Sequence, residues 1–226
     1  MDMFIFILFI LFIAIVVIGI YIWIQKCKER RKKELSGWAF SHNLNFSDTH
    51  DGEIEERYPY FKCLQQGNRR YGYNIMEGSI DSRKICAFDY HYETSDGKNT
   101  HHYYFSAVIL DTGLPLKPLF IRNENFFDKV ADFFGFDDIN FESVEFSKQF
   151  YVKSPDKKWA YDVLHQETME FLLGSPRFYL DFHGRHVIAY RKNVFMVPDF
   201  EDALHVITGI LDRLPASVVQ ELKEGK

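Results

Sequence analysis

The sequence predicts an α+β protein: an N-terminal transmembrane helix, then antiparallel sheet with helices packed on one side. Three observations predict this fold class. Residues 3–24 form one apolar run, alternating aromatic and β-branched residues separated by turn signals extend to Arg122, and segments with helical spacing follow. Strands that succeed one another through short turns form a meander rather than a βαβ series. Each half reads as a hairpin followed by a helix, which hints at two similar lobes, 48–136 and 137–226.

The apolar run at residues 3–24 has the properties of a membrane anchor. It contains no charge and no proline, and a helix of about 22 residues spans about 33 Å, enough for the hydrocarbon core of a bilayer. A cleaved signal peptide is the competing interpretation. However, the preceding Met1-Asp2 is acidic, and no small-residue cleavage site lies before Gln25. We therefore expect a signal-anchor, with the lipid bilayer as the partner of residues 3–24.

The charges beside the anchor predict its orientation. Asp2 alone precedes the run, whereas six basic residues follow it: Lys26, Lys28, Arg30, Arg31, Lys32 and Lys33. Because Lys and Arg near a membrane end stay in the cytoplasm, residues 1–2 should face out and the folded domain should face the cytoplasm at the inner or plasma membrane. The odd number of cysteines, three, fits a reducing compartment.

The charge of the remaining chain restricts its partners. Residues 35–226 hold 21 of the 27 basic residues and 29 of the 32 acidic residues. A nucleic-acid surface needs the opposite balance, so we expect no nucleic-acid partner. The basic residues belong to a juxtamembrane stalk, 25–47, which either only sets the topology or also senses anionic lipid. Residues 48–226 form the soluble domain.

The first half predicts the stalk and the meander. Leu35, Trp38, Ala39 and His42 recur at helical spacing. The strands expected after them are Tyr73–Ile80, Lys84–Tyr92, His101–Leu110 and Leu116–Arg122, the first two joined at Asp81-Ser82-Arg83 as a hairpin.

The second half predicts alternating helices and strands, marked by caps and turns. The spacing predicts a helix over 126–134 that Gly135 ends, a strand over Ser147–Lys153, and a helix that Ser154 caps with Pro155 at its first position. A second hairpin is expected from Phe178–Phe182 and His186–Tyr190 around Gly184-Arg185. A final helix, capped by Asp199, should bury Phe200, Ala203, Leu204, Ile207, Leu211 and Leu214.

Residues 141–173 resemble an uncharacterised family of bacterial membrane-anchored domains. The resemblance rests on Glu142–Phe146, Phe150-Tyr151-Val152, Asp156, Ala160 and Met169 with Leu172-Leu173. It implies a membrane-anchored fold and carries no catalytic residues. The same positions are also what the core of a strand–helix unit requires.

Two groups of histidines and aspartates are candidate metal sites. Asp89, His91, His101 and His102 come together if the strand from His101 pairs with the one that holds His91; only one of His101 and His102 can share its face, because neighbours alternate. In the expected second hairpin, His183 pairs with His186, with Asp181 diagonal to them. Two imidazoles and a carboxylate suit a divalent metal such as zinc. The simpler interpretation, which we favour, is an exposed sheet face rich in tyrosine and histidine for the first group and polar turn residues for the second.

No nucleophile elbow and no phosphate-binding glycine loop occurs in the sequence. Cys63 and Cys86 lie in strand-like contexts that favour buried thiols. We therefore predict no catalytic residues and no cofactor, and a non-enzymatic binding or scaffolding module with a protein partner. The alternatives are a metal-dependent hydrolase that uses one His/Asp group and an anionic-lipid sensor.

Overall fold

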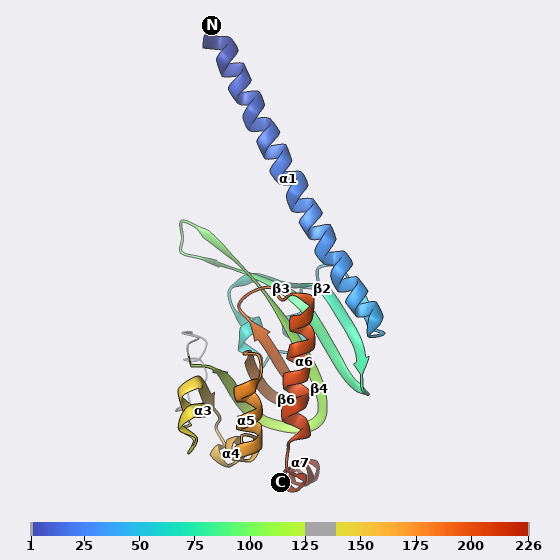
Figure 1. Ribbon diagram of the computed structural model, residues 1–226, viewed down its shortest axis with the longest axis vertical. Helices are drawn as coiled ribbons and strands as arrows, with labels where there is room; N and C mark the ends of the chain where they lie inside the picture. Colours follow the sequence, from blue (N-terminus) through green and yellow to red (C-terminus); the bar gives the residue numbers. More distant parts are fainter. Residues whose placement is uncertain (1, 125–138, 226) are drawn as a thin grey trace.

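The computed structural model describes residues 2–124 and 139–225. Its first helix, α1 (Asp2–Ser41), runs unbroken from the apolar segment into the folded part (Figure 1). Among the described residues, α1 is a helix that is long and apolar enough to cross a membrane, and no part of its most apolar stretch is buried in the protein. Leu35, Trp38 and Ala39 are buried where α1 meets the domain. The predicted anchor and the predicted stalk as far as Ser41 are therefore one continuous helix, whereas the end of the range given to the stalk forms strand β1 (Asn45–Ser47).

The strands form one antiparallel sheet, and together with the helices described below it confirms the predicted α+β class. Five of the strands follow the order β1-β2-β3-β4-β5, while β6 pairs with β4. Their bounds are β1 (Asn45–Ser47), β2 (Asn68–Ile80), β3 (Arg83–Ser95), β4 (Thr100–Asn123), β5 (Phe150–Lys153) and β6 (Tyr179–Arg191). Strands from 48–136 and from 137–226 thus share one sheet through β4.

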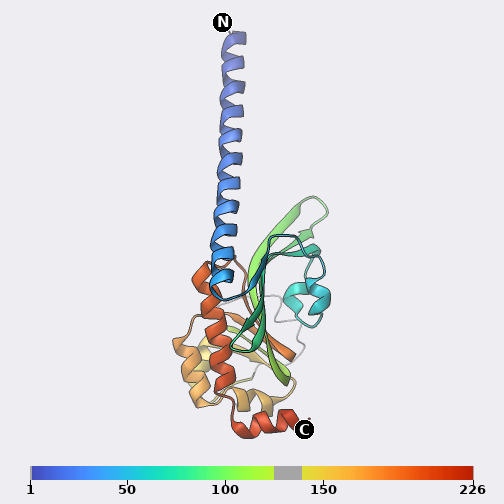
Figure 2. The same ribbon diagram turned by 90° about the vertical axis from the view of Figure 1, so that its right-hand side faces the viewer.

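The predicted meander is present at β2, β3 and β4. Ile80 pairs with Arg83, and the intervening Asp81 and Ser82 have φ of 50° and 64°. Positive φ at both central residues is the turn geometry that matches strand twist in a two-residue hairpin. In both views the β3–β4 hairpin, light green in Figure 1, extends beyond the rest of the sheet toward the end of the molecule from which α1 projects (Figures 1 and 2).

The predicted second hairpin is wrong, because β6 is a single strand. It pairs with β4 from Ser106↔Arg191 to Ile121↔Leu180, and the register shifts around Leu116. Gly184, opposite Leu116, has a φ of 57°. From Asp111↔His186 to Leu119↔Phe182, β4 advances eight residues and β6 only four, so the extra residues lie in β4. Gly184 thus takes a positive φ within β6, and the strand continues without reversing. The predicted strand Leu116–Arg122 is correspondingly the second part of β4.

The helices of the second half differ from prediction at their starts. Residues expected to open a strand instead form a short helix whose first turn Ser143 caps by accepting from Phe146 N–H. Asp156 caps the next helix by accepting from Trp159 N–H at 3.0 Å, whereas the hydroxyl of Ser154 donates to Pro118 O at 2.7 Å. The helices are α3 (Val144–Gln149), α4 (Lys157–Val163), α5 (Gln166–Gly174), α6 (Val197–Asp212) and α7 (Ala216–Glu224). The helix predicted over 126–134 lies outside the described residues.

The two faces of the sheet have separate cores. On one face, the end of α1 and the helices of the second half pack on residues such as Met76, Val108 and Leu180, as predicted. On α6, Phe200, Ala203, Ile207 and Leu211 are buried as expected, whereas Leu204 is half-buried. Leu214 is buried just beyond the end of the helix, and Asp199 lies in the first turn of α6. On the other face, the short α2 (Ile54–Arg57) and the 3-10 helix η1 (Lys62–Gln65) cover Phe88 and Tyr90. Figure 2 shows these two layers edge-on.

Candidate functional site

A buried ion pair fastens α1 to the sheet. Arg31 donates from Nε to Asp89 Oδ2 at 2.8 Å and from Nη2 to Asp89 Oδ1 at 2.6 Å. Its third nitrogen, Nη1, donates to Phe195 O at 2.7 Å. Asp89 is fully buried, and a two-pronged guanidinium–carboxylate contact is the strongest form of such a pair. Arg31 is therefore part of the fold as well as of the membrane-flanking charge.

Neighbouring strands complete the coordination of Asp89. Asn74 in β2 donates from Nδ2 at 2.8 Å, and Ser106 in β4 donates from Oγ at 2.5 Å. Asn74 has a φ of 50° at a register shift between Tyr73 and Met76, so a bulge directs its amide toward Asp89. Each carboxylate oxygen of Asp89 accepts two hydrogen bonds. The structure thus engages Asp89 with α1 and does not bring it into the histidine group.

The same face of the sheet becomes polar and aromatic beyond Asp89. Along β3, Asp89, His91 and Glu93 alternate onto one face. Tyr71 and Tyr104 lie opposite His91, on β2 and β4 respectively. Their rings lie 4.6 Å and 4.8 Å from the ring of His91.

A pocket of about 440 Å³ lies between α1 and this part of the sheet; we call it the helix–sheet pocket. Its α1 wall consists of Lys28, Glu29, Arg31 and Lys32. Tyr71, Tyr73, Asn74 and Tyr104 form the sheet wall, and Asp48 and His50 close one end. The pocket therefore combines the basic flank of the apolar run with three phenol rings.

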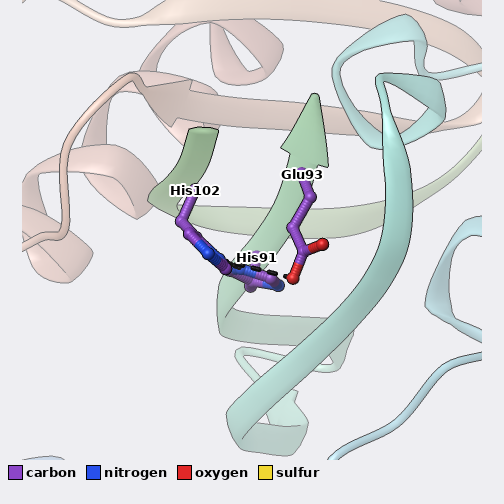
Figure 3. Close-up of side chains that lie close together, drawn as sticks. All are labelled: His91, Glu93 and His102. Carbon is purple, nitrogen blue, oxygen red and sulfur yellow. Dashed lines mark hydrogen bonds and ion pairs between the residues drawn. The ribbon is translucent and has the colours of Figure 1, made fainter. Parts of the chain in front are cut away.

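His91, Glu93 and His102 form the group among the described residues that has the spacing of metal ligands (Figure 3). One nitrogen or oxygen from each lies within 4.8 Å of the others. His91 Nε2 is 3.1 Å from His102 Nδ1, and His102 Nδ1 is 3.3 Å from Glu93 Oε1. In a tetrahedral zinc site the ligand nitrogens lie about 3.4 Å apart, so small adjustments produce a three-ligand site.

The surroundings of His91 favour its use as a ligand. Its other nitrogen, Nδ1, is 3.3 Å from Arg69 O, and a backbone carbonyl in that position orients a metal-bound imidazole. Burial lowers the pKa of His91, which keeps the ring neutral and its lone pair available. His101 points away from this group and pairs with Asp96 at 3.6 Å. The structure therefore brings together two of the four residues of this predicted group and adds Glu93.

The other predicted group surrounds Tyr60 instead of a metal-ligand constellation. The ring of His183 stacks on Tyr60 with centroids 4.7 Å apart, and His186 Nδ1 lies 2.5 Å from the Tyr60 hydroxyl. Asp181 is buried in β6, where desolvation raises its pKa well above the usual value. His183 and His186 lie on the single strand β6 and share Tyr60 as an aromatic partner.

The basic residues that predict orientation divide into paired and unpaired cations. Lys32 pairs with Asp48, and Arg30 is 3.8 Å from Glu34 on the exposed side of α1. Lys26, Lys28 and Lys33 have no ion pair within the described part of the chain. Cys63 and Cys86 are buried, as expected, and burial raises the pKa of both thiols.

Sequence reasoning did not identify Glu93, Tyr60 or the phenols of the helix–sheet pocket. For Glu93 a signal exists, because a residue two positions after His91 in a strand must share its face. Tyr60 has no comparable signal, since its contact with His186 joins residues 126 positions apart.

No protein-family model and no curated protein sequence matches this chain. Among solved structures, the chain is similar to the crystal structure of the mycobacterial trehalose monomycolate transport factor A, TtfA. The TM-score is 0.60 at 11% sequence identity, and the match covers 81% of this chain and 96% of that chain. At this identity the similarity establishes a shared fold.

Proposed function

We propose that this chain is a non-enzymatic accessory protein that holds a folded binding module rigidly against the cytoplasmic face of a membrane. The observation that carries the proposal is the junction of anchor and domain. α1 continues without a break past the apolar run, and Arg31 on it enters the buried network of Asp89. A flexible linker would serve a chain that only needs to stay near the membrane, whereas this junction fixes how the domain is presented.

Two further observations support an accessory role. The basic residues after the apolar run favour a cytoplasmic domain. The similar fold belongs to a protein described as a transport factor, which is compatible with a partner that is itself embedded in the membrane. Fold similarity alone does not transfer an activity, so the partner must be found by experiment.

The orientation is tested with reporters at the C-terminus, next to Gly225. A fluorescent protein that matures only in the cytoplasm should fluoresce when fused there, and a phosphatase that is active only outside should remain inactive. The opposite pattern would place the domain outside and remove the cytoplasmic part of the proposal.

The binding role is tested by photo-crosslinking in native membranes. A photoreactive residue is introduced in place of Tyr103, which is exposed on the β3–β4 hairpin. We expect a discrete crosslinked product with one partner. The yield of this product should fall in Arg31→Ala, because the change loosens the junction although the chain stays in the membrane. An anchor of residues 1–34 on an unrelated soluble domain is the control. Equal crosslinking by this control, or no loss with Arg31→Ala, would contradict a rigidly presented binding module.

The ligand spacing of His91, Glu93 and His102 favours a second candidate function, which is metal-dependent hydrolysis. A His₂Glu set leaves a fourth position open for water, which a bound zinc ion activates. Metal binding by this group is the first requirement of that candidate.

A further inference from the structure

We infer that the helix–sheet pocket binds the phosphate headgroup of an anionic lipid from the leaflet into which α1 is inserted. This inference rests on the proposed function, since it names a ligand for the module that α1 holds at the membrane. The pocket is about 440 Å³ in volume, which lies within the range of small-molecule sites.

The position of the pocket along α1 places it at headgroup depth. Lys28 lines the pocket four positions after Ile24, the last residue of the apolar run. At a rise of about 1.5 Å per residue, Lys28 lies about 6 Å beyond the hydrocarbon boundary. The headgroup layer is about 5–7 Å thick on each side of the core. A lipid can therefore place its headgroup at this rim while its acyl chains stay in the bilayer.

The groups that face the pocket without a partner are mainly hydrogen-bond donors. Within the described residues, the hydroxyls of Tyr71, Tyr73 and Tyr104 make no hydrogen bond, and the ammonium of Lys28 has no ion pair. Phenol hydroxyls are protonated at neutral pH and can donate hydrogen bonds. Three O–H groups and one ammonium suit the oxygens of a phosphate, which accept hydrogen bonds and carry negative charge.

The remaining charges of the pocket are largely satisfied. Arg31 is held by Asp89, and Lys32 is held by Asp48. Within the described part of the chain Glu29 has no ion pair, although its charge acts on nearby Lys32, and it opposes an anion at the same rim. The surrounding flank is nevertheless basic, because Lys26 and Lys33 also have no ion pair among the described residues. Selectivity for an anionic headgroup thus depends on Lys28 and the phenols, and Glu29 limits it.

The test uses the delipidated full chain in a neutral detergent, with bound lipid measured by native mass spectrometry. Short-chain phosphatidylglycerol is titrated against phosphatidylcholine and against free glycerol phosphate. We expect phosphatidylglycerol to bind about tenfold more tightly than phosphatidylcholine and free glycerol phosphate to bind more weakly than either lipid. Equal affinity for the two lipids would overturn the anionic assignment, and tighter binding of glycerol phosphate would identify a soluble ligand instead of a lipid.

Matched variants locate the binding. Replacing all three phenols by phenylalanine removes only hydroxyl groups and should weaken phosphatidylglycerol binding about tenfold, whereas Tyr103→Phe should have no effect, because Tyr103 stacks on Tyr92 outside the pocket. Lys28→Gln should weaken binding about threefold and Lys26→Gln should not. Glu29→Gln should tighten it about threefold. Equal losses at Lys26 and Lys28, or no change with the three phenylalanines in a chain that unfolds at an unchanged temperature, would refute the site.

The outcome is separable from that of the proposed function. Lipid binding is measured on the purified chain alone, whereas the binding module is tested by crosslinking in native membranes. If crosslinking finds no partner but the chain binds the lipid, only the proposed function is contradicted. If a partner is crosslinked but the chain does not bind the lipid, only this inference is contradicted.

Discussion

Removing Arg31 should destabilise the protein far more than removing its neighbour Arg30. Arg31→Ala leaves the charge of Asp89 buried without its cation, and loss of one member of a buried pair costs about 3–5 kcal/mol. Asp89 retains hydrogen bonds from Asn74 and Ser106, and the side chain of Arg31 is 24% exposed. We therefore expect the lower end of that range, about 3 kcal/mol in the free energy of unfolding.

The assay is urea unfolding of the full chain in non-ionic detergent, followed by the fluorescence of the buried Trp38 and Trp159. Arg30→Ala is the control, because its exposed contact with Glu34 on the same helix should contribute no more than about 0.5 kcal/mol. Hydrogen exchange over residues 30–41 should rise in Arg31→Ala and stay unchanged in the control.

A double variant makes the reasoning stricter. Adding Asp89→Asn to Arg31→Ala removes the uncompensated charge. The double variant should therefore lose less free energy of unfolding than the sum of the losses in the two single variants. The reasoning is refuted if Arg31→Ala costs as little as Arg30→Ala, or if the two single costs add without coupling.

Three further predictions concern the other titratable groups. Burial raises the pKa of Asp181, so the stability that this carboxyl contributes is fully present below pH about 3.8 and is lost as pH rises through its folded-state pKa. Asp181→Asn should therefore raise the melting temperature at pH 8 and not at pH 4. A lower melting temperature of the variant at pH 8 would contradict this. Burial lowers the pKa of His91 and His183, so their contribution is full above pH about 6.5 and decreases as pH falls. The melting temperature should drop between pH 7.5 and 5.5, less so with His183→Gln, and a flat profile in both proteins would count against it. In a zinc titration of the metal-free full chain, His102→Ala should abolish binding of one equivalent while the matched His101→Ala retains it, and equal behaviour of the two variants would exclude the group.

The alternation of strand residues predicted part of the candidate site. Because successive side chains point to opposite faces, only one of His101 and His102 was expected beside His91, and His102 is the one that lies there. The same rule accounts for Glu93 once the strand is known. The turn at Asp81 and Ser82 was also predictable, since residues that favour turns lie there between two segments with the pattern of strands.

Long-range contacts were not predictable from local pattern. Arg31 and Asp89 are 58 positions apart. The sequence pattern indicated a role in membrane topology for Arg31 and a place in a metal site for Asp89. Gly184 shows a different limit: glycine indicates positive φ, but the pairing partner decides whether the chain reverses or continues. The partner here, β4, is long enough to pair on both sides of Gly184.

Because α1 is unbroken, the rotation and the height of the domain relative to the membrane depend on the number of residues between Ile24 and Arg31. Each residue added between Ile24 and Arg31 would turn the domain about 100° around the anchor and move it about 1.5 Å from the bilayer. One inserted residue would therefore present a different side of the domain to a partner that contacts a fixed face of the anchor, whereas seven would complete nearly two turns and restore the original rotation about 10 Å farther from the bilayer. The helix fixes both the rotation of the domain around the anchor and its distance from the bilayer. The segment between Ile24 and Arg31 should therefore tolerate substitution better than insertion.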